Sequence, residues 1–220
     1  MKFRRSRSEE PEPVDEPEEE SRAATEGPDG DADPRVHGPW DEAEVDLDEE
    51  NPNRVDLGGM LVVGRPGLDL HLQVDESTSQ VVGVTLAGAD SALELRPFAA
   101  PRNGEVWSAL RRTMAAEVTR QGGTATEIEG EFGTELKIAL AVQLPTGQSG
   151  TQPSRVLGIA GPRWMLRATF FGKAALEPNP ADEVELALRD VVVVRGGEAI
   201  PPGDPLPLRV PPNAQRVDPS

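Results

Sequence analysis

The chain has no cysteine and no tyrosine, and only two of its 220 residues are histidines. Without cysteine it can form no disulfide, no thiolate zinc site, no iron–sulfur cluster and no cysteine nucleophile. His37 lies in an acidic N-terminal segment, and His71 lies on the polar side of an expected strand. We therefore expect no Ser–His–acid triad, no histidine-based metal site and no cofactor.

Long apolar runs are also missing. No segment approaches the roughly 18 consecutive apolar residues that a membrane-spanning helix needs, so no membrane span is expected. The start of the chain is basic, with Lys2, Arg4, Arg5 and Arg7, but the apolar run of a secretory signal does not follow. We therefore expect a cytoplasmic protein whose first residues are the solvated start of a flexible tail, rather than a contact for nucleic acid or lipid.

Negative charge is present in excess, and most of it lies near the N-terminus. Residues 1–54 contain 19 Asp and Glu against 7 Lys and Arg, which gives −12 of the net charge of −17. This segment is rich in proline and poor in large apolar residues, so it is predicted to be a disordered acidic tail. Trp40 is the exception, and it either docks on the domain or a partner or remains exposed.

A single α+β domain is predicted over residues 55–199, followed by a proline-rich strap and tail over residues 200–220. Alternating apolar and polar residues predict strands over residues 68–74 and 81–87, the latter with Val82, Val84 and Leu86 on one face. A third strand follows, with Leu93 and Leu95 inward and Glu94 and Arg96 outward. Further strands are predicted over residues 124–129, 136–144, 154–159 and 164–170. Residues 191–194 are apolar on both faces and predict a central, covered strand.

Two helices are predicted between these strands. The first has Asn103 as its N-cap and an apolar stripe that includes Trp107, which is expected to anchor the core. The second begins near Asn179 and Pro180. The predicted fold is α+β, a mostly antiparallel sheet of about seven or eight strands with two helices. This order of elements is similar to the α/β/α sandwich of the photosystem extrinsic proteins, which is an analogy of fold only.

Several strings in the chain carry a resemblance to a known family. They are Val55-Asp56-Leu57-Gly58-Gly59, Arg65-Pro66-Gly67, residues 70–75, Ala99-Ala100-Pro101-Arg102, residues 117–123, Gly133-Thr134-Glu135-Leu136, Gly161-Pro162-Arg163-Trp164 and residues 189–196. Over about residues 36–210 the chain resembles an actinobacterial family of uncharacterised proteins, a domain of unknown function. The resemblance implies an acidic N-terminal tail and brings no catalytic motif. Members can be encoded near a dUTPase and an OB-fold protein, which implies nucleotide or nucleic-acid housekeeping.

Five arginines form the candidate site: Arg96, Arg102, Arg155, Arg163 and Arg167. All fall on the polar side of predicted strands or in the turns between them. If several converge, they could hold a carboxylate or phosphate of a ligand or partner. They could equally hold the acidic tail, or be dispersed and solvated beside nearby glutamates.

The leading interpretation is a non-enzymatic binding or adaptor domain with disordered arms. Its partner is an unknown protein or its own acidic tail. The alternative is a small-ligand enzyme that acts on nucleotides or phosphates with arginine and carboxylate groups. A deep pocket lined by arginines would favour the enzyme, and an exposed patch would favour the adaptor. The net charge of −17 argues against nucleic acid as a partner, because it repels a phosphate backbone.

Overall fold

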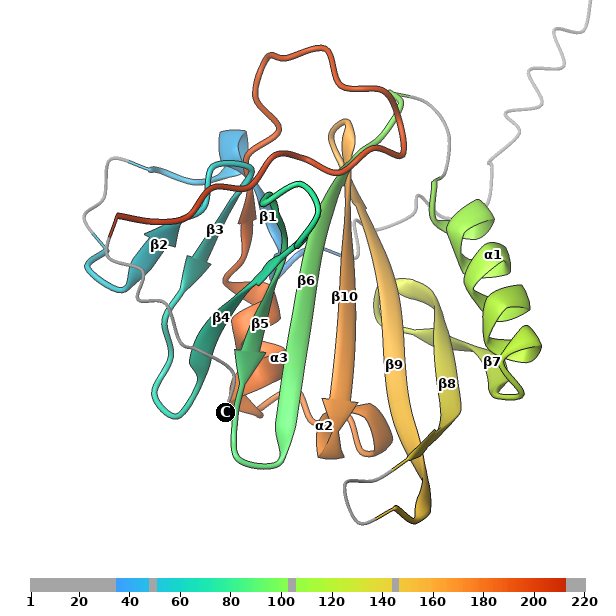
Figure 1. Ribbon diagram of the computed structural model, residues 1–220. Helices are drawn as coiled ribbons and strands as arrows, with labels where there is room; N and C mark the ends of the chain where they lie inside the picture. The colour runs from blue at the N-terminus through green and yellow to red at the C-terminus, as the bar shows by residue number, and fades with distance from the viewer. Residues whose placement is uncertain (1–34, 48–50, 103–105, 144–146, 213–220) are drawn as a thin grey trace, which may run out of the picture. The chain divides into compact units, whose positions relative to one another are not determined.

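A computed structural model describes residues 35–47, 51–102, 106–143 and 147–212. These residues form a mixed α+β domain built on a seven-stranded antiparallel sheet (Figure 1). The strands of this large sheet, in spatial order, are β4 (Asp69–Val74), β5 (Val81–Ala87), β6 (Ser91–Ala99), β10 (Trp164–Gly172), β9 (Ser149–Gly161), β8 (Gly133–Gln143) and β7 (Thr124–Gly130). The predicted fold class is confirmed.

A second, smaller sheet separates from the first, although the sequence indicated only one. Its strands in spatial order are β1 (Trp40–Asp41), β11 (Val192–Val193), β3 (Met60–Val63) and β2 (Arg54–Asp56). β1 runs parallel to β11, and the other pairs are antiparallel. Val192 and Val193 are both buried in the interior of this sheet, so the predicted covered strand is confirmed, in the small sheet rather than the large one.

β1 lies before Val55, where the alternation of apolar residues suggested that the fold begins. The backbone N–H of Trp40 donates to the carbonyl of Val191 at 2.8 Å, and Trp40 is half-buried. Asp41 is buried, accepts a hydrogen bond from Nε1 of Trp164 at 2.6 Å and caps the short 3-10 helix η1 (Glu42–Glu44). Part of the predicted tail, around Trp40 and Asp41, therefore packs on the domain, and residues 1–34 lie outside the described residues.

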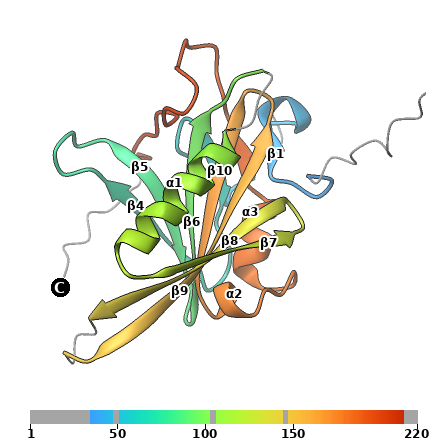
Figure 2. The same cartoon turned by 90° about the vertical axis from the view of Figure 1, so that its right-hand side faces the viewer.

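Three α-helices are found in the described parts of the chain, where two were predicted. They are α1 (Trp107–Arg120), α2 (Lys173–Leu176) and α3 (Glu183–Arg189). The predicted cap Asn103 lies outside the described residues. α2 was missed because it is a single turn, too short for an apolar repeat to show. α1 and α3 lie on different sides of β9 and β10 (Figure 2).

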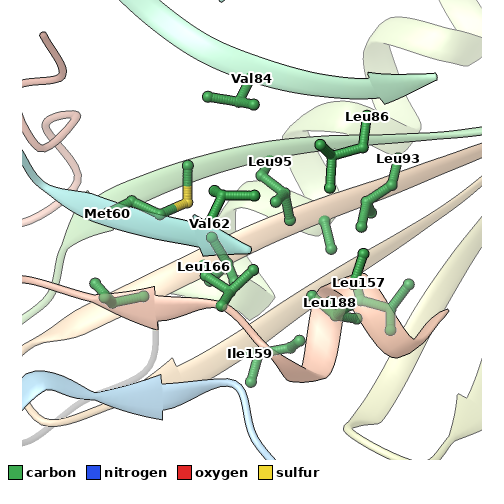
Figure 3. Close-up of a cluster of buried hydrophobic side chains, with 14 of the residues drawn as sticks. Met60, Val62, Val84, Leu86, Leu93, Leu95, Leu157, Ile159, Leu166 and Leu188 are labelled. Carbon is green, nitrogen blue, oxygen red and sulfur yellow. The ribbon is translucent and has the colours of Figure 1, made fainter. Parts of the chain in front are cut away.

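The main core fills the space between the large sheet, the small sheet and α2 and α3 (Figure 3). Leu93 and Leu95 of β6 point into it, as predicted. A second, smaller core lies under α1 and contains Trp107, which is 4% exposed. The indole ring covers Gly158, where an added Cβ would lie 2.2 Å from a ring carbon, and its Nε1 donates to the carbonyl of Thr134 at 2.6 Å. The prediction of Trp107 as a core anchor is confirmed.

The register of β5 differs from the prediction at its start. Val84 and Leu86 are buried as expected, but Val82 is only half-buried and Val81 takes the buried position instead. The pairing of β4 with β5 shifts by one residue between Gln73 and Val74. An inserted residue of this kind reverses the face to which the following side chains point, and simple alternation cannot reveal it.

The proline-rich strap joins the two sheets. Its backbone pairs with the end of β6 through Ala99 N–H to Asp204 carbonyl at 2.8 Å and Leu206 N–H to Pro97 carbonyl at 2.9 Å. Further along, Gly59 N–H donates to the carbonyl of Pro207 at 3.1 Å. Leu206 is buried in the main core, so the part of the strap up to residue 212 is a structural element, and residues 213–220 lie outside the description.

Candidate functional site

Two of the five predicted arginines, Arg96 and Arg167, lie side by side on the large sheet. They stand directly opposite each other in the antiparallel register of β6 and β10. Nη2 of Arg167 donates to Oε1 of Glu94 at 3.0 Å, and Nε of Arg96 lies 2.8 Å from the same oxygen. Two guanidinium groups therefore share one carboxylate, and the three side chains together carry a net charge of +1.

Neighbouring strands complete this network. Nε2 of Gln73 on β4 donates to Oε2 of Glu94 at 2.9 Å and to Oγ1 of Thr85 at 2.8 Å, while its Oε1 accepts from Nη2 of Arg96 at 2.6 Å. Residues directly opposite each other in a sheet share a face, so these side chains lie on the side away from the main core. We call this surface the polar face; its members are His71, Gln73, Thr85, Glu94, Arg96 and Arg167.

The polar face lies beside the area that α1 covers. α1 contacts chiefly β7, β8 and β9, and it lies toward those strands in Figure 1. Arg96 keeps 31% of its side chain exposed and Arg167 keeps 17%, while His71 is exposed as predicted. Burial, together with the charge of Arg96, lowers the pKa of Arg167, although Glu94 opposes this shift. The paired guanidinium groups therefore occupy a half-buried position in which a further anion would be favourable.

Arg155 lies on the opposite face of the sheet, and the prediction of a polar-side position for it is wrong. The residue is 5% exposed, and its guanidinium carbon lies 4.2 Å from the ring centroid of Phe170. Nη1 of Arg155 is 3.4 Å from Oε2 of Glu135 on β8, and Nη2 donates to Glu185 on α3. β9 is covered on both faces here, by α1 on one side and by α3 on the other. The alternation of residues along β9 therefore does not distinguish a buried face from a solvent-exposed one.

We call Glu135, Arg155 and Glu185 the buried triad. The two glutamates are 4% and 7% exposed. Burial raises the pKa of both carboxyl groups above the usual value, against the opposing effect of Arg155. Two carboxylates facing one guanidinium leave the triad with a net charge of −1 when both are ionised. A cavity of about 230 Å³ adjoins the triad and is also lined by Phe132 and Arg189.

Arg102 and Arg163 do not join either group. Both side chains are exposed, Arg102 in the segment that precedes α1 and Arg163 in the turn between β9 and β10, where its φ is 64°. The structure thus brings together two of the five predicted arginines, buries a third elsewhere and leaves two in solvent.

The sequence of residues 38–217 matches a family model described as "Protein of unknown function (DUF3710)". The chain belongs to this family. The matched region begins two residues before β1 and extends past the strap, so it includes the polar face, the buried triad and the docked segment around Trp40. No curated protein matches the chain. Among the residues that the structure describes, no helix is long and apolar enough to cross a membrane.

Three carboxylates that pair with the predicted arginines were not identified from the sequence: Glu94, Glu135 and Glu185. Glu94 was placed correctly on the outward side of β6, but nothing in the pattern showed that two arginines share it. Glu135 precedes the strongly alternating residues of β8, and Glu185 lies one residue after the apolar Val184 of α3. The sequence marks each of them only as a charged residue within a mostly apolar element. Many solvated glutamates share this feature, so it does not identify a paired carboxylate.

Proposed function

We propose that this chain is a non-enzymatic, cytoplasmic binding domain that holds an acidic segment of a partner against its polar face. The observation that carries the proposal is the direct opposition of Arg96 and Arg167 over a single shared carboxylate. Like charges directly opposite each other destabilise a sheet. The opposition of the two arginines therefore destabilises the sheet when no anion is present. A carboxylate supplied by a partner would relieve this repulsion, so the pair is a suitable anchor for it.

The strength of this anchor follows from Coulomb's law. A carboxylate at about 4 Å from one excess positive charge gains roughly 1 kcal/mol in water and about 4 kcal/mol at the effective dielectric of a protein surface. A single contact of this size gives weak binding. This binding should also weaken as salt is added, because the charges are half-exposed.

The alternative of a small-ligand enzyme receives less support. Of the two cavities described, the one of about 330 Å³ is lined by none of the five predicted arginines. The cavity beside Arg155, at about 230 Å³, lies below the range of roughly 300–1,000 Å³ that is typical of ligand pockets. The partly exposed arginine pair, which lines neither cavity, therefore favours the adaptor.

The partner in this proposal is defined by its chemistry. It is an acidic peptide segment, and an unknown protein is one source of it. The acidic residues 1–34 of this chain are a second source of the same chemistry. Both sources offer carboxylates, so both are tested by the same probe.

The test is fluorescence anisotropy with a labelled oligoglutamate peptide and the full chain. We expect saturable binding that is lost in the R96Q/R167Q variant, because glutamine keeps hydrogen-bond donors near Glu94 but removes both charges. The R102Q/R163Q variant is the matched control: it loses the same charge from the same predicted set at exposed positions, and it should bind as the wild type does.

Circular dichroism melts of both variants establish that they are folded. Equal loss of binding in the two variants would show that the peptide responds only to net charge, and the polar face would then not be the site. An oligolysine peptide that binds as well as oligoglutamate would contradict the proposal too.

A further inference from the structure

Phe171, near the end of β10, is an aromatic side chain that belongs to neither core. The other phenylalanines of the described chain, Phe98, Phe132 and Phe170, each pack on one of the two cores. Phe170 faces the main core, so alternation along β10 directs Phe171 to the opposite side of the sheet. Phe171 is half-buried, and it is not among the described residues that pack on either core. Its ring is therefore an apolar group on the same side of the sheet as the polar face.

Two alanines lie beside Phe171 on neighbouring strands. Phe171 stands opposite Ala92 on β6, and Ala92 stands opposite Ala87 on β5. Both alanines are half-buried, and neither is among the described residues of the two cores. We call Ala87, Ala92 and Phe171 the apolar row. Because alanine is short, an apolar side chain of a partner can lie over it and contact the ring.

The apolar row continues the polar face along the same two strands. On the outward side of β6 and β10, the opposed pairs follow one another in this order: Arg96 with Arg167, Glu94 with Thr169, and Ala92 with Phe171. Each step is two residues long, so the apolar row lies roughly 13 Å from the arginine pair. An extended peptide has the same rise per residue, so positions four residues apart in it span this distance.

The middle pair restricts what a partner can place between the two ends. Both oxygens of Glu94 are already engaged, Oε1 by Arg167 and Oε2 by Gln73. A partner carboxylate at this step would lie beside the carboxylate of Glu94 and be repelled by it. The surface therefore presents a positive pair, a negative residue and an apolar row at equal steps.

We infer that the acidic segment held by this surface also carries a large apolar side chain, four residues from the carboxylate that meets Arg96 and Arg167. The apolar side chain packs on Phe171, and the residue midway between the two is not acidic. This inference rests on the proposed function, which supplies the carboxylate contact. It adds a second contact that selects among acidic segments, so a segment of glutamate alone binds more weakly than one with this pattern.

Three end-capped peptides of equal charge and length test the inference on the full wild-type chain. Each has one central glutamate in a glycine–serine background. The first has leucine four residues before and four residues after the glutamate, so it fits in either chain direction. The second has serine at those positions, and the third has leucine two residues away on each side. Two-dimensional amide NMR titration gives the affinities.

We expect the first peptide to bind about tenfold more tightly than the second, because burial of a leucine side chain contributes at least about this factor. It alone should shift the amides of Ala92 and Phe171. The third peptide should bind as the second does, because its leucines fall at the step occupied by Glu94.

The F171S variant should reduce the affinity of the first peptide to that of the second and leave oligoglutamate binding unchanged. The matched control is L176S, which removes an apolar side chain that is 61% exposed on α2. Neighbouring residues of α2 pack on the main core, on the other side of the sheet, so L176S should bind as the wild type does. Circular dichroism melts establish that both variants are folded, and the comparison of the three peptides on the wild type needs no variant.

Equal affinities of the first and second peptides for the wild type would overturn the inference. The proposed function would survive that result if oligoglutamate still binds and loses its binding in R96Q/R167Q. Absence of binding by oligoglutamate and by all three peptides would overturn both. An affinity of the first peptide that R96Q/R167Q leaves unchanged, or that F171S and L176S lower equally, would also overturn the inference.

Discussion

Arg155 shows how much a single side chain can determine in this fold. It is buried between two glutamates from different elements and stacks on Phe170, so β8, β9 and α3 meet at its guanidinium group. Replacing a buried ion pair with apolar residues is often neutral, but removing one partner leaves uncompensated charge behind. In this triad, loss of the arginine would leave two uncompensated carboxylates.

The first prediction follows from this difference between replacing a whole ion pair and removing one partner of it. Arg155→Gln should lower the free energy of unfolding by about 3–5 kcal/mol at pH 7, because it leaves Glu135 and Glu185 buried without their counter-charge. Urea denaturation followed by circular dichroism measures the loss. The exposed Arg163→Gln is the control and should change stability by less than about 0.5 kcal/mol. Equal effects of the two substitutions would show that the triad contributes no more than an exposed charge.

The second prediction concerns pH. Burial raises the pKa of Glu135 in the folded state, so the folded chain binds a proton more readily than the unfolded chain does. The stability that this group contributes is therefore fully present below its unfolded pKa and is lost as pH rises through the higher folded pKa. Glu135→Gln removes this dependence and leaves Arg155 paired with Glu185.

The stability of E135Q relative to the wild type should thus increase between about pH 4 and pH 7, which urea midpoints at the two pH values measure directly. A relative stability that stays constant across this range, or that changes in the opposite direction, would mean that folding does not raise the pKa of Glu135.

At the scale of elements, the strand β1 is joined to the domain by backbone pairing and by side-chain contacts. It pairs with β11 over two residues, and the carboxylate of Asp41 joins it to the buried indole of Trp164. Arg35, whose guanidinium carbon lies 5.4 Å from the centroid of the same ring, adds a second link and pairs with Glu44. The carboxylate of Asp41 is the buried acceptor among these links.

Asp41→Ala should accordingly lower the free energy of unfolding by about 1–3 kcal/mol, because it leaves the Trp164 N–H buried without a partner. Amide hydrogen exchange at Trp40 should become faster at the same time, as β1 detaches more often. Asp69→Ala, at an exposed position at the start of β4, is the control and should affect neither quantity. Unchanged exchange at Trp40 in Asp41→Ala would show that β1 is held by its backbone pairing alone.

The sequence predicts the elements of this fold better than their grouping. The alternation of apolar and polar residues was enough to predict β6, β8 and β10. The continuous apolar run was enough to predict the covered strand β11. Both patterns depend only on local burial. The separation into two sheets and the parallel pairing of β1 with β11 depend on contacts between residues about 150 positions apart. Nothing local to Trp40 shows which strand it will join.

The same distinction explains the candidate site. Arg96 and Arg167 were placed on the polar side correctly, because one face of β6 and β10 is dry and the other is partly wet. Their direct opposition depends on the register between these strands, which alternation does not specify. Arg155 was predicted on a polar side that does not exist, because both faces of β9 are covered at that point.

At the scale of the whole molecule, acidic and basic groups are unevenly distributed. The first 54 residues hold −12 of the net charge of −17, whereas the polar face presents two arginines to one glutamate. Complementary charge between two surfaces gives fast, salt-sensitive association. The central claim is that such association takes place at the polar face and not at the buried triad.

The most direct measurement is a two-dimensional amide NMR titration of the full chain with unlabelled oligoglutamate peptide. We predict shifts concentrated at Gln73, Thr85, Arg96 and Arg167. These shifts should disappear at about 1 M salt, where the Debye length falls to about 3 Å. Shifts that instead centre on Arg155 and Glu185, or that persist unchanged at high salt, would contradict the account.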